Sequence, residues 1–195
     1  MTNINSILYG ITSGLANRQQ LAHICNRFRE PLCTVAIKPE DLFESGVSVM
    51  ALDFDGVLAP HGASEPLPEV VVWLRKCSNV LGEEKIYILS NKPDPQRAAY
   101  FKKFFPTVHF IAGVRKKPYP DGLKRIMEIS GAAPQQVVLL DDRLLTGVLA
   151  TCLAETSVIY ITKPYVSLRT HPVAESFFLL LRAVERKFVS LLNLW

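Results

Sequence analysis

The chain opens with one long amphipathic segment and a connector framed by prolines. Between residues 4 and 30 the apolar side chains recur roughly on one helical face, which predicts a helix over this range. Pro31 and Pro39 frame the connector, and a short helix is predicted from Lys38, with proline near its first turn. We therefore expect residues 1–46 to form a helical segment that precedes the main body of the protein.

From residue 47 onward, short apolar runs alternate with longer amphipathic segments. The apolar runs predict five buried strands, at residues 47–53, 85–90, 108–111, 136–141 and 158–162. The amphipathic segments predict helices at residues 67–81, 95–105, 120–130, 146–153 and 174–194. Strands that are apolar on both faces and alternate with helices are typical of a parallel sheet covered on both sides. The expected fold is α/β, a three-layer Rossmann-like core over residues 47–165, followed by a C-terminal amphipathic helix within 166–195.

Composition narrows the class of protein without identifying it. The 195 residues suit a single domain, and a net charge of +4 without an aromatic–basic repeat gives no reason to expect nucleic-acid binding. The four cysteines lack the spacing of a zinc site, so reduced thiols are expected. No apolar run has the length of a membrane span, and the N-terminus lacks the layout of a secretory signal. We expect a cytoplasmic or organelle-matrix protein that is not secreted, with a transit peptide as an open alternative.

Asp53 and Asp55 are the first carboxylates to follow a predicted strand of this core, and Gly56 comes directly after them. Side chains at i and i+2 of an extended strand point the same way, so both carboxylates should lie on one side of the chain. Two carboxylates that close repel each other unless a cation lies between them, and Mg²⁺ is the natural choice. Taken alone, however, Asp-x-Asp-Gly is common in turns.

The later strands of the predicted sheet also end in polar residues. Ser90 and Asn91 follow the second strand, and Lys117 follows the third. Asp141 and Asp142 end the fourth strand. Each group has an ordinary explanation on its own: a helix cap or turn, a solvated basic loop, or carboxylates at a helix start. Because ligands of open α/β sheets bind at the carboxyl ends of the strands, their joint occurrence at successive strand ends predicts a functional site.

The residue types at these strand ends suit phosphoryl transfer. One carboxylate can act as nucleophile and a second as acid and base, while Mg²⁺, Ser and Lys hold phosphate oxygens. In this order the motifs resemble those of the haloacid-dehalogenase-like (HAD) phosphatase superfamily, over about residues 47–162. The resemblance implies that Asp53 forms an aspartyl-phosphate. It also implies that Asp55 protonates the leaving oxygen and then activates the hydrolytic water.

The same resemblance assigns the residues that would bind the substrate. Ser90 would hydrogen-bond the transferring phosphoryl group, with Asn91 beside it. Lys117 would neutralise both the phosphate and the nucleophile. Within the superfamily the chain resembles subclass III A, which lacks a large inserted cap, and in particular YqeG-type proteins and phosphatidylglycerophosphate phosphatases. The segments that carry this closer likeness are residues 37–42, 46–47, 90–91, 115–118, 142–146 and 158–164.

For the metal, the resemblance implies that Asp53, the backbone carbonyl of Asp55 and Asp142 bind Mg²⁺. Two positions depart from the family's usual pattern. Asp141 stands where Gly is usual, and Gly147 stands where the family's motif typically ends in Thr-Asp. The carboxylate missing at 147 normally supports the surroundings of the metal. We expect Mg²⁺ to bind through Asp142, with Asp141 as a candidate substitute for the missing group.

The segment between the first two strands is largely one helix, which leaves no room for a large cap domain and predicts an open active site. Open sites in this superfamily can take bulky substrates, such as a lipid head group. The C-terminal helix carries Arg182, Arg186 and Lys187 among its polar positions, so it could pack on the core or lie at a membrane surface as a peripheral contact.

The leading hypothesis from the sequence is a Mg²⁺-dependent phosphomonoester hydrolase, with phosphatidylglycerophosphate as the first substrate to consider. One alternative is a HAD phosphatase of a soluble phosphometabolite, nucleotide or phosphoprotein. A second alternative, from another class, is a binding protein that kept the fold without catalysis.

Overall fold

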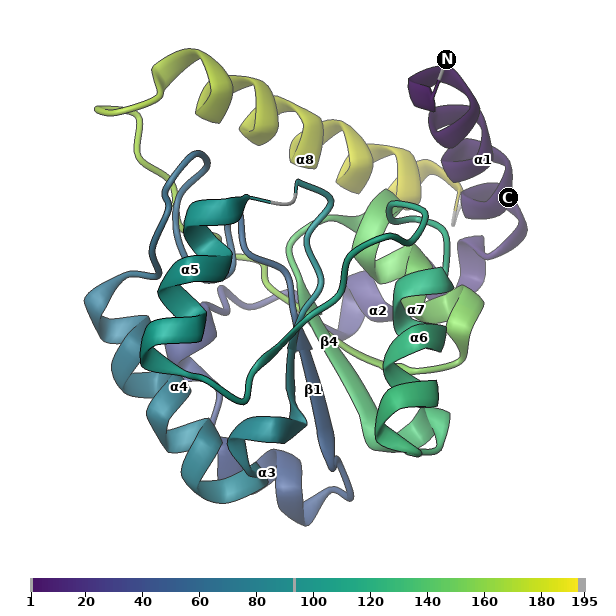
Figure 1. Cartoon of the computed structure of the whole chain (residues 1–195). Coiled ribbons are helices and arrows are strands. Elements are labelled where there is room, and N and C mark those ends of the chain that lie inside the picture. Colours follow the sequence, from purple (N-terminus) through teal and green to yellow (C-terminus); the bar gives the residue numbers. More distant parts are fainter. Residues whose placement is uncertain (1, 93, 193–195) are drawn as a thin grey trace.

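A central sheet with helices on both of its faces forms the body of the protein (Figure 1). The computed structural model describes residues 2–92 and 94–192. All five strands are parallel and lie in the spatial order β3-β2-β1-β4-β5. Their bounds are β1 Val49–Leu52, β2 Ile86–Ile88, β3 His109–Phe110, β4 Val137–Asp141 and β5 Ser157–Tyr160. The predicted α/β, three-layer, Rossmann-like fold is confirmed, with each strand somewhat shorter than the apolar run that predicted it.

The helices alternate with these strands and extend the chain at both ends. Their bounds are α1 Thr2–Ala16, α2 Arg18–Arg27, α3 Pro39–Glu44, α4 Pro68–Leu81, α5 Pro95–Phe104, α6 Asp121–Ser130, α7 Leu149–Ala154 and α8 Pro172–Leu192. Short 3₁₀ turns lie at Thr34–Ala36, Glu83–Lys85 and Pro134–Gln136, and a π-helical turn, η4, spans Leu144–Val148. One helix, α4, fills the connection between β1 and β2, so this connection contains no cap domain.

The alternation of side chains along β1 explains why both faces of the sheet are covered. Met50 and Leu52 point into an apolar cluster with α4 and α5, where Trp73 is among the buried residues. Val49 and Ala51 point the other way, into a cluster with α6 and α7. Fully burying such a side chain contributes roughly 1.5–3 kcal/mol. A rigid, water-excluding sheet therefore lies beneath the loops that follow its strands.

The N-terminal region is helical over most of residues 4–30, as predicted, but it consists of two helices, α1 and α2, and ends at Arg27. The break lies at Asn17, whose φ of −104° and ψ of 20° are not helical. Its side-chain amide donates to the carbonyl of Ser13 at 2.8 Å, and asparagine side chains that bond to nearby backbone compete with helix formation. The break turns α2 so that Leu21 and Ala22 are buried beside α7 and Val189 of α8.

Helix α8 lies across the top of the molecule in Figure 1 and covers the carboxyl ends of the strands. Its inner face consists of Glu175, Phe178, Arg182, Glu185 and Val189, at the spacing of three and four residues that one helical face requires. The site therefore has no inserted cap, as the sequence predicted, but α8 covers part of it. The helix was predicted over residues 174–194, and residues 193–195 lie outside the described part of the chain.

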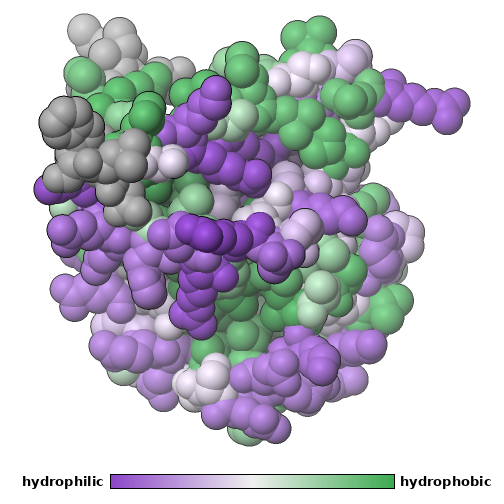
Figure 2. All heavy atoms as spheres, turned by 180° about the vertical axis from the view of Figure 1, so that it is seen from behind, coloured by the Kyte–Doolittle hydropathy of each residue, from purple (hydrophilic) through white to green (hydrophobic). Residues whose placement is uncertain are grey.

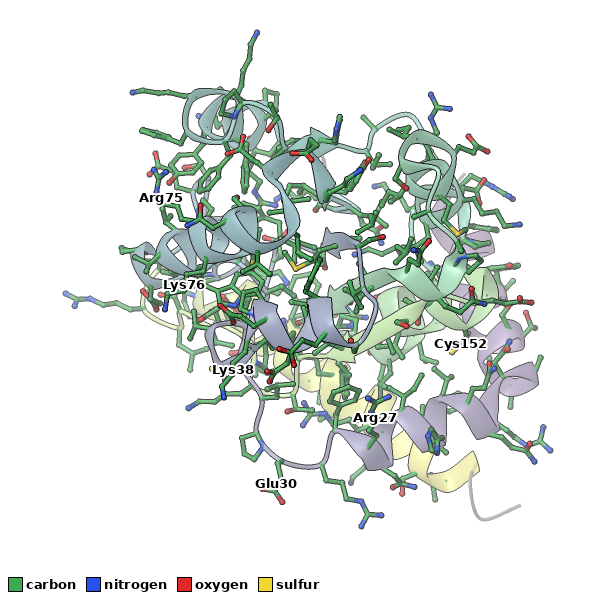
Figure 3. All side chains as sticks on the ribbon, turned by 90° about the horizontal axis from the view of Figure 1, so that it is seen from below. Arg27, Glu30, Lys38, Arg75, Lys76 and Cys152 are labelled. Atoms are coloured by element: carbon green, nitrogen blue, oxygen red, sulfur yellow. The ribbon has the colours of Figure 1, made fainter. Side chains whose placement is uncertain are left out.

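The opposite end of the molecule carries charged side chains. Figure 3, a view from below, labels Arg27, Lys38, Arg75 and Lys76, all of which are exposed. The residues predicted to form the site lie at the other end of the sheet, beneath α8. Within residues 2–92 and 94–192, no helix combines the length and the apolar character needed to cross a bilayer.

Candidate active site

A cavity of about 360 Å³ lies at the carboxyl ends of the strands, under α8. Its walls include the six residues predicted from the strand ends: Asp53, Asp55, Ser90, Asn91, Lys117 and Asp142. Parallel neighbouring strands bring these residues together, since β1 lies between β2 and β4 and pairs in register with both. The sequence prediction of one shared site is consistent with this placement.

Lys117 is the central cation of the cavity floor, with its side chain only 3% exposed. Its Nζ lies 3.1 Å from Asp53 Oδ1 and 2.5 Å from Asp141 Oδ2. Burial alone would lower the pKa of Lys117, but the two carboxylates outweigh burial and raise this pKa above its ordinary value. The two carboxylates thus favour the charged ammonium, which contacts the carboxylate that the sequence proposes as nucleophile.

Asn91 positions Lys117. Its Nδ2 donates to the carbonyl of Lys117 at 2.9 Å, and its Oδ1 accepts from the backbone N–H of Lys117 at 2.7 Å. Asn91 therefore fixes the backbone of Lys117, while its side chain also lines the cavity and keeps a second amide hydrogen. Ser90 lines the cavity, with its hydroxyl 3.2 Å from the N–H of Lys92 in a local turn.

Asp141 and Gly147 occupy the same small volume beneath the cavity. A Cβ atom placed on Gly147 would lie 1.9 Å from Asp141 Cγ, far inside contact distance. The carboxylate of Asp141 therefore fills the space that a side chain at 147 would need, and reaches Lys117 from there. The two positions that the resemblance marks as departures therefore lie in direct contact. This contact is consistent with the expectation that Asp141 takes the place of a carboxylate at 147.

Three carboxylates, on Asp53, Asp141 and Asp142, each offer an oxygen within 4.8 Å of the others, a group that could hold a metal ion. Burial raises the pKa of Asp53 to about 6 in spite of Lys117, which lowers it. Burial also raises the pKa of Asp142 to about 7 in spite of Arg182. Burial is the main cause of both shifts, and the neighbouring carboxylates add to it. Hard oxygen donors in such a cluster suit a hard divalent cation.

Arg182 reaches this cluster from α8 and was not predicted to belong to the site. Its side chain is 3% exposed, and its guanidinium pairs with Asp142, to which Nε donates at 2.5 Å. The same group lies against Gly56, where an added Cβ would approach Nη2 to 2.8 Å. The sequence interpretation placed Arg182 among the basic positions of a helix that could face a membrane; the structure places it inside. The Asp142 carboxylate is therefore already paired with a positively charged side chain of the protein itself, Arg182.

Asp55 is held by a second unpredicted arginine, Arg97 of α5. Nη1 and Nη2 of Arg97 donate to the two carboxylate oxygens of Asp55, at 3.0 and 2.7 Å. The Nε of Arg97 donates to the carbonyl of Ala63 at 2.9 Å, and its guanidinium lies 3.9 Å from the centre of the Phe54 ring. Asp55 thus faces the cavity with its position fixed by a buried, bidentate ion pair.

Helix α8 is fixed over the cavity by further polar contacts. Glu185 accepts from Arg143 Nε at 3.0 Å and from the N–H of Leu144 at 3.0 Å. Glu175 accepts from the backbone N–H of His61 at 3.0 Å. The sequence offered one signal for this role, the regular spacing of Glu175, Arg182 and Glu185 on one helical face, but it did not tell which partners that face would meet.

Comparison of the chain with protein-family models, with curated proteins and with solved structures found no match. The function is therefore inferred from the residues of the cavity and their contacts.

Proposed function

We propose that the protein is a Mg²⁺-dependent phosphomonoester hydrolase that forms an aspartyl-phosphate on Asp53, with the chemistry of HAD-like phosphatases. One observation carries the proposal: the Asp53 carboxylate lines the cavity under α8 with the buried Lys117 ammonium at 3.1 Å and Asp142 beside it. A nucleophilic carboxylate next to a fixed cation is what attack on a phosphate dianion requires, because the cation offsets the repulsion between the two anions.

Each residue of the cavity would have a separate role in such a reaction. An oxygen of Asp53 attacks phosphorus, the bond from phosphorus to the leaving oxygen breaks, and the leaving oxygen takes up a proton. Water then attacks the aspartyl-phosphate, which releases phosphate and restores the carboxylate. Lys117 would neutralise charge throughout, and Ser90, which lines the cavity, would donate to a phosphoryl oxygen. The resemblance of the sequence motifs names Asp55 as the source of the proton.

Asp53, Asp142 and the backbone carbonyl of Asp55 would hold Mg²⁺, with Asp141 next to them. The bound ion would supply charge neutralisation at the phosphoryl oxygens. The hard oxygens of the carboxylate cluster fit this ion. Arg182 uses an oxygen of Asp142, so cation binding must weaken or displace that ion pair. The same pairing is the observation that favours the non-catalytic alternative, in which Arg182 replaces the metal.

Removing this competing charge should strengthen metal binding. We expect Arg182→Met to lower the dissociation constant for Mn²⁺, an electron-paramagnetic stand-in for Mg²⁺, by roughly tenfold. Arg186→Met is the matched control, since Arg186 lies one turn further and donates to Tyr160 and to the carbonyl of Thr162. Equal Mn²⁺ affinity in wild type and Arg182→Met would contradict the placement of the cation. Failure of the wild-type protein to bind Mn²⁺ would favour the binding-protein alternative.

The substrate class is proposed from an apolar groove that opens beside the cavity. This groove, of about 440 Å³, lies between α1 and α8 and shares Asn91, Lys117, Arg143 and Thr146 with the active site. Its other walls are largely apolar: Ile7, Ile11, Leu145, Phe177, Leu181 and Val184. Figure 2 shows apolar side chains along the upper edge of the molecule, where α1 and α8 lie. A phosphate monoester with an apolar tail fits both spaces, and phosphatidylglycerophosphate is the first candidate.

Hydrolysis of a lipid phosphate by the wild-type protein should depend on this groove. We expect Ile11→Glu, on the exposed side of α1, to lower kcat/KM for detergent-dispersed phosphatidylglycerophosphate by about tenfold or more, since a buried tail contributes about 0.8 kcal/mol per methylene. Turnover of glycerol phosphate should stay within a factor of about two. Val72→Glu, at an exposed position of α4, is the control. Faster wild-type turnover of soluble phosphate esters, or equal losses on both substrates, would support the soluble-substrate alternative.

A further inference from the structure

The outer face of α8 is apolar, which is the reverse of an ordinary surface helix. Such a helix turns its apolar stripe to the core and its charged side chains to solvent. On α8 the charged residues Glu175, Arg182 and Glu185 are buried at the inner face. The outer face carries a stripe of apolar residues at helical spacing, each more than half exposed: Val173, Phe177, Leu180, Val184 and Leu191. These five residues, the outer stripe, point away from the core.

Helix α1 adds a second apolar strip beside the outer stripe. The sequence of α1, Thr2–Ala16, contains no charged residue. Its exposed Ile7 and Ile11 line the groove of about 440 Å³ together with Phe177 and Val184 of the outer stripe. The two helices lie at the same end of the molecule (Figure 1). Single exposed apolar side chains are ordinary, but a continuous apolar face marks a site of interaction.

Basic side chains border this apolar face. Lys187 lies within the outer stripe, Lys116 lines the groove, Arg18 begins α2 directly after α1, and Arg169 lies in the turn before α8. All four are exposed, and among the described residues no ion pair neutralises them. The two glutamates of α8 are buried, and α1 has no acidic residue. The face therefore combines exposed apolar side chains with positive charge.

We propose that the outer stripe and α1 dock the protein on an anionic lipid surface, with α8 lying in the plane of the head groups. An interfacial helix buries its apolar face at the boundary between head groups and acyl chains, and neighbouring basic side chains attract anionic lipids. The charge pattern favours lipid over a second copy of this chain. A two-fold dimer through this face would bring the same basic side chains toward one another, and like charges oppose association.

This inference goes beyond the proposed function and does not depend on it. If both hold, docking gives the groove between α1 and α8 a direct source of its substrate. The groove shares Lys117 and Thr146 with the active-site cavity. A lipid phosphate would then enter from the membrane surface without passing through water.

Flotation of the full chain with vesicles of phosphatidylcholine and phosphatidylglycerol tests the docking. The wild-type protein should float with these vesicles. We expect Leu180→Glu, at an exposed position of the outer stripe, to weaken vesicle binding by about tenfold or more, since it replaces a side chain buried in lipid by a charge. Val72→Glu, at a similarly exposed position of α4, is the matched control and should bind as the wild type does. Circular dichroism checks that both variants fold.

A second variant tests the basic border. We expect Lys187→Gln to weaken binding to anionic vesicles by about fivefold at low salt, because each basic side chain near an anionic surface contributes about that much. Its binding to vesicles of pure phosphatidylcholine should match that of the wild type. Lys76→Gln is the matched control, at an exposed position on the opposite end of the molecule (Figure 3).

Several results would overturn the docking. Failure of the wild-type protein to float with either kind of vesicle would refute it, as would equal vesicle binding by the wild type and Leu180→Glu. Equal wild-type binding to neutral and anionic vesicles would refute the role of the basic border. A dimer in sedimentation velocity that Leu180→Glu dissociates, without vesicle binding, would assign the face to a second copy of the chain. None of these measurements needs turnover, so absence of phosphatase activity would refute the proposed function alone.

Discussion

Gly147→Asp is expected to destabilise the protein by about 3 kcal/mol or more, because two side chains would compete for one buried space. A Cβ at 147 would lie 1.9 Å from Asp141 Cγ and from its Oδ2. The new carboxylate would also be a like charge beside a buried one. Gly147→Ala separates the two effects, since it adds the Cβ without the charge and should already be strongly destabilising.

Asp141→Gly is expected to destabilise by about 2–4 kcal/mol for a different reason, since it removes one partner from a buried ion pair. Lys117 is 3% exposed and would keep Asp53 as its partner. In the double variant, Asp141→Gly with Gly147→Asp, the carboxylate at 147 enters the space that residue 141 vacates. The double variant should therefore be more stable than the sum of the single changes by about 2 kcal/mol or more.

Urea unfolding followed by circular dichroism measures these differences. The three variants and the wild type form a double-mutant cycle, and a large favourable coupling is the expected result. Additive losses would show that the two positions do not share one space, and that Asp141 does not replace a carboxylate at 147.

Asp53→Asn is expected to lower phosphatase turnover by at least about 10³-fold, since the amide cannot act as nucleophile. The variant should fold, because Lys117 keeps its contact with Asp141 and the cluster loses one of its repelling carboxylates. Circular dichroism checks the fold, and phosphate release from 4-nitrophenyl phosphate with Mg²⁺ checks the rate. Asp121→Asn, at a partly exposed aspartate paired with Arg115, is the matched control and should keep wild-type turnover.

The sequence could predict the sheet and the residues at its carboxyl ends because their placement follows from topology. An apolar run followed by a carboxylate, a hydroxyl or an amine predicts both a strand and the position of that group. Asp53, Ser90 and Asp142 therefore come together in any parallel sheet in which their strands are close neighbours. The strand order β3-β2-β1-β4-β5 makes them so.

The partners of these residues could not be predicted in the same way. Arg182 lies 40 residues beyond Asp142, and Arg97 lies 42 residues beyond Asp55. No periodicity links such pairs, because they depend on how a helix crosses the sheet. The pattern of α8 does show a polar face. Charged residues on an amphipathic helix are usually solvated, however, and whether they meet water, lipid or a buried site is decided by packing.

The relation between Asp141 and Gly147 was visible in the sequence only as two separate departures from a family pattern. The space they share depends on the π-helical turn η4, which directs the backbone of residue 147 at the side chain of residue 141. The path of the backbone through η4 therefore decides whether glycine at 147 leaves the site without a carboxylate or leaves that space to the carboxylate of Asp141.

The central claim is that Asp53 carries the phosphoryl group, and trapping that group tests the claim most directly. The wild-type protein is mixed with Mg²⁺ and radiolabelled 4-nitrophenyl phosphate, quenched in acid and mapped by peptide mass spectrometry. We predict a hydroxylamine-sensitive acyl phosphate on Asp53 that is absent from Asp53→Asn. Label on another residue, such as Ser90 or His61, or label that persists in Asp53→Asn, would contradict the proposed mechanism.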